Sequence, residues 1–270
     1  MNYNQLFHKF IPIPIPIIII GLLVCQCIFS YGQMSENAIK PDTLPAAKNA
    51  KAKLPKLRVG AQVGYGYRNN YITQSTFYSD GMSKPIPNSM KNHLLKLNHN
   101  ISYGADFSYF ILNYFGLGLR YNGINAMASS PEVLFPIEDG TFVRGSISEK
   151  VGVHYFGIYF SIRHFLPSKK HCLFANVGAG CVNYRSNLKI NGKKLTLNDD
   201  SAGFAAEFGY DFFVTKHFAV GLQTSLFFGT QKYFSYIIKD GNITLGKSIR
   251  QPKRLNFNHI DISIGFRFYK

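Results

Sequence analysis

The segment 258–270, NHIDISIGFRFYK, ends the chain and alternates strictly between two kinds of side chain. Its apolar residues are Ile260, Ile262, Ile264, Phe266 and Phe268, and its small or charged ones are Asp261, Ser263, Gly265 and Arg267. Because successive side chains of a strand point to opposite faces, one face of this segment is apolar and the other is polar. A strand between lipid and a polar lumen requires this pattern. The segment therefore predicts the closing strand of a membrane β-barrel.

The other end of the chain carries an export signal. Lys9 precedes an apolar run over 11–29, and small residues follow it at the positions that signal cleavage requires. Three prolines interrupt the run, and its unbroken remainder is shorter than the ~20 residues of a spanning helix, which disfavours an uncleaved anchor. We expect residues 1–32 to be a removed signal peptide. Residues 33–55, rich in Ala, Lys and Pro, are expected to form a flexible periplasmic leader or a loose lumen plug.

Composition favours a β-barrel over a helical membrane protein. The 270-residue chain is 46% hydrophobic and 15% aromatic. Its mean hydropathy of -0.04 is too polar for a bundle of helices in lipid, and no second apolar run of spanning length occurs. The formal net charge is +16, so the positions of the lysines and arginines have to be found before the charge indicates a partner.

Two cysteines, Cys172 and Cys181, remain after the expected signal cleavage. On one strand their odd spacing points them to opposite faces and places them too far apart for a disulfide. We interpret both as small apolar strand residues. No cysteine spacing typical of a metal site occurs, and we expect neither a metal nor a cofactor.

Eight segments have the length and composition of strands that cross a bilayer. They are 56–67, 100–111, 115–126, 147–164, 172–185, 202–214, 218–229 and 257–269. An even number lets an antiparallel sheet close without an edge, which lipid requires. Residues 56–270 are therefore predicted to form an all-β, eight-stranded antiparallel up-and-down transmembrane barrel.

The connections between these segments alternate in length. Those after the second, fourth and sixth segments are short, and those after the first, third, fifth and seventh are long. This alternation predicts short periplasmic turns and long extracellular loops. A soluble lipocalin-like barrel, with its apolar faces inward, remains the alternative fold, because alternation alone does not say which face is wet.

The charged residues of the expected strands share the face opposite the apolar side chains. This face holds Arg58, Arg120, Arg163 and Arg267 together with Asp106, Glu207, Asp211 and Asp261. Charges inside a membrane are costly unless they face the interior and pair, so we predict a lumen filled by a salt-bridge network. An eight-stranded barrel is just wide enough for its side chains, which disfavours an open pore. In the fourth segment the parity is irregular, which predicts a bulge or a later entry into the membrane.

No catalytic constellation stands out in the sequence. Glu207 and Asp211 lie roughly 13 Å apart along a strand, too far to share a proton. Small barrel enzymes that modify lipid A place a serine beside a histidine at the outer lipid boundary, but no strand here has that local spacing. A triad assembled across strands is not excluded by this observation. We expect a non-enzymatic protein with no catalytic residues.

A basic segment lies between the last two expected strands. Residues 230–256 contain Lys232, Lys239, Lys247, Arg250, Lys253 and Arg254, against the single acidic residue Asp240. A basic extracellular surface suits the phosphates of lipopolysaccharide or an anionic partner. Nothing in the chain is similar to a nucleic-acid-binding module.

Several segments resemble a known domain. RVGAQVGYGY (58–67), GADFSYF (104–110), FGLGLRY (115–121), FAAEFGYDFF (204–213) and HIDISIGFRF (259–268) are similar to the outer-membrane protein beta-barrel domain, or porin family, and to small barrels of the OmpA and OmpX kind. The resemblance covers about 56–270. It implies an integral outer-membrane location and recognition of the C-terminal strand by the barrel-assembly machinery. Tyr269 and Lys270 depart from the pattern, since such barrels often end on the aromatic residue.

These observations together predict an integral outer-membrane barrel with a structural or surface-interaction role. The expected partners are outer-membrane lipid, lipopolysaccharide and a surface or secretion partner that the basic extracellular segments contact. A narrow passive channel for small solutes is the first alternative. A lipid-modifying enzyme and a secretion-accessory barrel are the others.

Overall fold

The computed structural model describes residues 54–68, 87–136, 142–240, 243–256 and 258–270, and the side chains of 230–256 lie outside that description. The expected signal peptide and nearly all of the expected leader also lie outside the described residues. No helix in the described ranges is long and apolar enough to span a membrane. The elements are β1 (Leu57–Tyr67), α2 (Asn88–Lys96), β2 (His99–Phe110), β3 (Phe115–Pro136), β4 (Phe142–Phe165), β5 (His171–Ile190), β6 (Lys193–Phe213), β7 (Phe218–Asp240), β8 (Ile243–Asn256) and β9 (His259–Tyr269).

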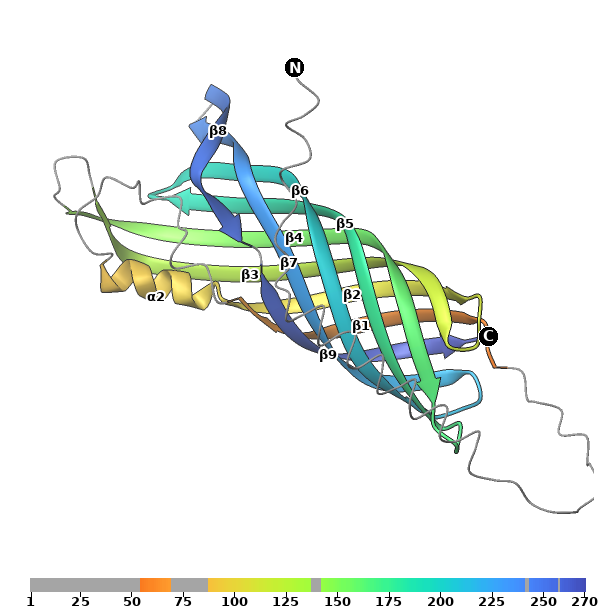
Figure 1. Ribbon diagram of the computed structural model, residues 1–270. Coiled ribbons are helices and arrows are strands. Elements are labelled where there is room, and N and C mark those ends of the chain that lie inside the picture. The colour runs from red at the N-terminus through yellow and green to blue at the C-terminus, as the bar shows by residue number, and fades with distance from the viewer. Residues whose placement is uncertain (1–53, 69–86, 137–141, 241–242, 257) are drawn as a thin grey trace, which may run out of the picture. The chain divides into compact units, whose positions relative to one another are not determined.

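The strands form one closed antiparallel ring (Figure 1). Their order is β6-β5-β4-β3-β2-β1-β9-β7-β8, and β6 also pairs with β7. Because β8 pairs with β7 alone, the other eight of the nine strands close the ring. β8 and β9 lie opposite successive parts of β7 and together act as one interrupted strand. The predicted eight-stranded up-and-down barrel is confirmed.

The short connections lie together at one end of the barrel, which we call the periplasmic end. They join β2 to β3, β4 to β5, and β6 to β7, as the sequence predicted. The opposite end is called the outer end. β1 and β2 reach the outer boundary of the membrane and stop there, whereas β3 to β7 run on with 22, 24, 20, 21 and 23 residues. These lengths are about twice the ~10 residues that a tilted strand needs to cross a bilayer.

Within the membrane part, the outward side chains are mostly apolar, and the charged side chains lie inward. In β9 the burial alternates without a break, and Ile262 and Ile264 are 57% and 54% exposed on the outer face. Three tyrosine–histidine pairs mark the two edges of this apolar belt. Tyr65 contacts His99, and the Tyr121 hydroxyl lies 2.8 Å from His154 Nδ1, at the outer edge. Amphipathic rings of this kind are typical of membrane interfaces, and the wet face is therefore the inner one.

The periplasmic edge of the belt carries the third pair, His171 with Tyr210. Along β5, the distance from His171 to Asn183, which lies opposite His154, corresponds to roughly 30 Å once the strand tilt is included. This is the thickness of the hydrocarbon core. The soluble lipocalin-like alternative is therefore wrong, because its apolar side chains would face inward along this length.

Beyond the outer edge the two faces exchange character. The inward side chains Val151, Val153 and Val182 form an apolar cluster there, whereas the outward Lys150 and Arg185 are exposed. Here the strands are surrounded by water instead of lipid. Their outward side chains are therefore polar, although the alternation of inward and outward positions continues unchanged. The outer part of the barrel is therefore built like a soluble β-protein.

This exchange explains the irregular fourth segment. β4 pairs with β5 in one unbroken register from Ile147 to Phe165, so it contains no bulge against that neighbour. The register shift with β3 falls between Ser130 and Val133, on β3. Of the two sequence-based explanations, later entry into the membrane is the correct one.

The chain between the expected fifth and sixth strands is not a long loop. β5 and β6 stay paired to Ile190 and Lys193, and Asn191 and Gly192 turn the chain with φ of 46° and 87°. Positive φ at both central residues is typical of the two-residue hairpin turn that favours Asn-Gly. The expected loops over 127–146 and 230–256 also consist largely of paired strand. The prediction of loops in these three places is corrected to strand extensions.

Helix α2 lies beside β3 at the outer end (Figure 1). Its buried Met90 and Leu94 pack with Val133, Ile147 and Leu188. These three residues lie on the inner face of β3, β4 and β5. The helix therefore covers the concave face of the wall, on the side where β1 and β2 have ended.

Candidate functional site

The interior of the membrane part is a layer of charged side chains. All eight charged residues predicted for the lumen are buried: Arg58, Asp106, Arg120, Arg163, Glu207, Asp211, Asp261 and Arg267. Buried charges are tolerated in proteins when each one has a partner. Their individual contacts therefore decide what the lumen can do.

The first ion pair lies between β1 and β2. Arg58 donates from Nη2 to Asp106 Oδ2 at 3.0 Å. Asp106 also accepts from the Tyr159 hydroxyl at 3.3 Å, and Ser108 Oγ lies 2.6 Å from the same hydroxyl. β4 is thereby tied to the pair, because Tyr159 reaches over Gly118 of β3 to β2.

The second ion pair lies between β9 and β6. Arg267 donates from Nη1 to Asp211 Oδ1 at 2.5 Å and from Nη2 to Gln223. Tyr269 donates its hydroxyl to the other Asp211 oxygen at 2.5 Å. The ring of Phe174 lies between the two pairs, with the Arg58 and Arg267 guanidinium carbons 4.6 and 4.7 Å from its centroid. Stacking on an aromatic ring suits the weakly hydrated guanidinium group.

The third ion pair crosses the barrel from β3 to β6. Arg120 contacts Glu207 Oε1 through Nη1. Glu207 also accepts hydrogen bonds from Asn176 at 2.8 Å, Ser225 at 3.0 Å and Gln223 at 3.3 Å. Glu207 thus joins β3, β5, β6 and β7, and it is the most connected carboxylate of the described lumen.

Two of the eight charges do not pair as expected. Arg163 contacts no carboxylate among the described residues; it donates to the carbonyl oxygens of Asn113 at 2.9 Å and Pro55 at 2.5 Å, with the Phe110 ring 3.4 Å below it. Asp261 lies 3.5 Å from His259 Nε2. The predicted balance of four arginines against four carboxylates is therefore wrong for these two. Arg163 instead fastens the periplasmic end, where backbone carbonyls are available.

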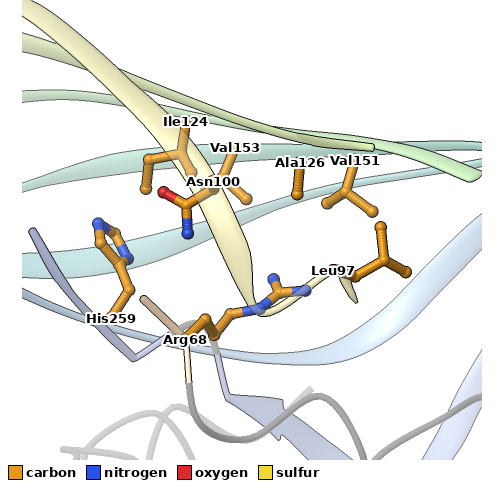
Figure 2. A pocket seen from close by; sticks show the side chains of 8 residues that line it. All are labelled: Arg68, Leu97, Asn100, Ile124, Ala126, Val151, Val153 and His259. Atoms are coloured by element: carbon orange, nitrogen blue, oxygen red, sulfur yellow. The ribbon is translucent and has the colours of Figure 1, made fainter. Parts of the chain in front are cut away.

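Above the charge layer lies a small cavity, seen from close by in Figure 2. It is lined by Arg68, Leu97, Asn100, Ile124, Ala126, Val151, Val153 and His259. Its water-accessible volume is about 10 Å³. That is the space of about one water molecule. The described interior is therefore packed at this level as well.

Helix α2, at the outer end, carries a buried histidine. His93 is fully buried, with Nδ1 3.1 Å from Ser130 Oγ and Nε2 4.0 Å from Glu149. Ser186 donates to Glu149 at 2.7 Å. Burial, together with the positive charge of Lys96, lowers the His93 pKa to about 4.

The basic surface predicted over 230–256 lies in β7 and β8. The side chains of Lys232, Lys239, Lys247, Arg250, Lys253 and Arg254 are outside the described residues, so their role stays a prediction. The backbone register adds a feature that the sequence did not indicate. Lys189 of β5 lies opposite Lys194 of β6, and Lys194 lies opposite Lys239 of β7. Lys189 and Lys194 are both exposed, and like charges directly opposite each other destabilise a sheet.

Neither cysteine belongs to a site. Cys172 is buried in the lumen and Cys181 is exposed on the outer face, and both are free. The predicted opposite orientation is confirmed. Among the residues that the structure describes, no group of three or more His, Cys, Asp or Glu side chains could hold a metal ion.

Comparison with solved structures matches the chain to outer-membrane proteins. A major outer membrane protein from Thermus thermophilus matches with a TM-score of 0.48 and 9% identity, over 78% of this chain and 99% of that one. OprG from Pseudomonas aeruginosa matches with a TM-score of 0.47 and 12% identity, over 80% and 97%. Neisserial surface protein A matches with a TM-score of 0.40 and 12% identity, over 79% and 97%. No protein-family model and no curated protein sequence matches the chain.

The closed ring, the apolar outer belt and the charged interior define the class of this chain. It is an integral outer-membrane β-barrel protein with eight strands in the membrane, as the residue pattern predicted. The lumen residues that sequence analysis missed are Tyr159, Phe174 and Tyr269. Their inward parity was readable in the sequence, but their roles depend on which strands face one another across the lumen.

We expect replacement of either member of the Arg120–Glu207 pair by leucine to destabilise the barrel. Each single change leaves a buried charge without its partner, at a cost of about 3 to 5 kcal/mol. The double change, Arg120→Leu with Glu207→Leu, is expected to recover much of this loss, because it removes both charges. The free energy of unfolding of protein refolded into lipid vesicles, measured in urea, tests this expectation.

A matched control for this experiment lies outside the membrane. Arg144 and Glu132 form a pair of 3.1 Å, and their side chains are 71% and 68% exposed. Arg144→Leu is expected to cost less than about 1 kcal/mol, because water screens exposed pairs. Unchanged urea midpoints for both lumen single variants would show that the lumen pair is not what holds the barrel.

The buried His93 predicts that α2 loosens in acid. Its pKa is about 4 when α2 is docked and about 6.5 when it is exposed. The undocked state therefore binds a proton first, and docking weakens as the pH falls from about 6.5 to about 4. At about pH 5.5 the population of undocked helix should rise about tenfold over its value at neutral pH. Hydrogen exchange of the α2 amides, corrected for the intrinsic pH effect, measures this change.

The control for the pH experiment is His93→Gln, whose amide keeps a partner for Ser130 but does not titrate. Its α2 protection should stay level over the same pH range. An equal loss of protection in His93→Gln would assign the effect to another group, with Glu149 the nearest one.

Proposed function

We propose that this protein is a closed, non-enzymatic outer-membrane barrel that holds a β-structured wall outside the cell for contact with an anionic surface partner. The observation that carries the proposal is that the described interior is filled at successive levels. The ion-pair layer fills the membrane part, and the apolar cluster of the outer part fills the next level. Met90 and Leu94 of α2 pack on Val133, Ile147 and Leu188 at the outer end. A barrel filled in this way has its outer surface available for function.

The strand extensions support a role outside the membrane. β3 to β8 continue beyond the outer tyrosine–histidine pairs, although a barrel that only anchors itself could end there. The lysine row Lys189–Lys194–Lys239 lies near the tips of these strands. Because facing lysines repel one another, an anion that bridges them would gain their full attraction and relieve the repulsion.

Because the interior is filled, we expect the barrel not to conduct ions. Full-length protein reconstituted in a planar bilayer should show no discrete conductance steps, with the N-terminal leader present or removed. The variant Arg120→Ala with Glu207→Ala should also be silent, because α2 and the apolar cluster remain in place. Steps in the unmodified barrel would favour a passive channel for small solutes over the proposed role. Steps that appear only after the leader is removed would assign residues 33–55 as a plug.

The lysine row predicts where the anionic partner binds. Lys189→Gln with Lys194→Gln should elute from an immobilised acidic polysaccharide at clearly lower salt than the unmodified protein, because two facing cations are lost. The matched control is Lys169→Gln with Lys170→Gln, which removes the same charge from an exposed turn at the periplasmic end. Equal elution shifts in both double variants would mean that only net charge matters, and would contradict a site at the strand tips.

A further inference from the structure

A second surface of the barrel, distinct from the strand tips, lies at the outer edge of the apolar belt on β4, β5 and β6. A groove of about 570 Å³ opens there on the outer face. Phe156, Cys181 and Ala202 form one cross-strand row at the groove, inside the belt. The next row toward the outer end holds His154, Asn183 and Asp200. The groove therefore joins an apolar floor within the membrane to a polar rim at its surface.

The polar rim is held in place by side-chain contacts. His154 Nδ1 lies 2.8 Å from the Tyr121 hydroxyl, and the two rings stack with an interplanar angle of 16°. Asn183 donates to Asp200 Oδ1 at 2.8 Å. A rim whose groups are already oriented loses less entropy when a ligand binds. Asn183 and Asp200 supply an amide and a carboxylate, which are suited to the hydroxyl groups of a sugar.

A niche lies beside this rim at Gly152. A Cβ atom there would be 3.4 Å from His154 Nε2 and 3.5 Å from Asn125 Oδ1, which is ordinary contact distance. A methyl group would therefore fit at this position without a clash. The Nδ1 atom of His154 contacts the Tyr121 hydroxyl, and its Nε2 atom lies beside this space.

Two cations border the niche. Arg185 lies opposite Gly152 on β5, and Lys150 lies two residues farther out on β4. Both side chains are exposed, and neither forms an ion pair with a carboxylate among the described residues. An arginine and a lysine beside an open niche suit a phosphate group. Asp200 lies on β6, two strands from Gly152 on β4. Because its carboxylate would repel a phosphate, the phosphate would lie on the Gly152 side.

We propose that this surface binds a phosphorylated, acylated glycolipid of the outer leaflet. The acyl chains lie along Phe156, Cys181 and Ala202, and the sugar hydroxyls meet Asn183 and Asp200. The phosphate lies at the Gly152 niche between Arg185 and Lys150. The order of these groups along the groove, from apolar floor to cationic rim, matches the order of the same groups in such a lipid. The proposal needs the membrane position of the barrel but not the anionic partner at the strand tips.

Native mass spectrometry of the full-length protein tests the site. The protein is reconstituted with bisphosphorylated lipid A at increasing amounts in a zwitterionic phospholipid, and the fraction that keeps one lipid A after release is recorded. Lys150→Gln with Arg185→Gln should need about tenfold more lipid A for the same retention, because the charge-assisted contacts are lost. Gly152→Leu, which fills the niche and changes no charge, should also lower the retention.

The control variant is Lys189→Gln with Lys194→Gln, which removes the same charge from the same wall nearer the tips. It should retain lipid A like the unmodified protein, although the proposed function predicts that it loses the acidic polysaccharide. The two proposals can therefore fail separately. Heat-dependent migration in gel electrophoresis confirms that each variant is folded.

Three results would overturn the lipid proposal. The first is an equal loss of retention in both double variants, which would indicate a general effect of charge. The second is equal retention of lipid A and its fully dephosphorylated form, which would show that the site does not recognise the phosphate. The third is equal retention of phosphatidylglycerol, which would show that the sugar part of the ligand is not recognised.

Discussion

The ion pairs inside the membrane are the interaction on which the rest of the structure depends. Lipid surrounds the barrel, so each strand has to place its polar groups inward, and eight strands leave too little space for water to solvate them. The charges must therefore satisfy one another. Arg120 and Glu207 do so from opposite sides of the ring, and Asn176, Gln223 and Ser225 complete the contacts of the carboxylate. A closed barrel of this width therefore requires that the charges inside it find partners.

Space for these pairs comes from inward glycines. A Cβ atom at Gly221 would collide with the Asp211 carboxylate and the Arg267 guanidinium, and one at Gly209 would collide with the Phe174 ring. Long side chains from one strand therefore lie over bare backbone of another. This arrangement lets a narrow lumen hold arginines and aromatic rings together.

Outside the membrane, the same strands have an apolar inner face and a polar outer face. Water now surrounds the wall, its inner face becomes apolar, and α2 covers that face where β1 and β2 are absent. The outer face becomes available for polar contacts at two heights. The base, at the tyrosine–histidine pairs, suits the headgroup of a lipid, and the lysine row near the tips suits a partner farther from the membrane.

Much of this architecture followed from period-two patterns alone. The alternation in 258–270 predicted the outward Ile262 and Ile264 and the inward Asp261 and Arg267, because lipid on one face permits only one parity. The ends of the strands were less predictable. Asn191-Gly192 is a strong hairpin signal. The segments around it are polar and predict a loop, because the outward positions of a strand become polar where water replaces lipid.

The contacts of the lumen were decided by the tertiary structure. The sequence by itself determined that Arg58, Arg120, Arg163 and Arg267 face inward, because parity is a local property of a strand. It did not determine that Arg163 meets backbone carbonyls while the other three meet carboxylates, nor that Gly152 lies beside Arg185. Those outcomes depend on the register between strands and on which strands face each other across a closed ring, and only the folded barrel sets these distances.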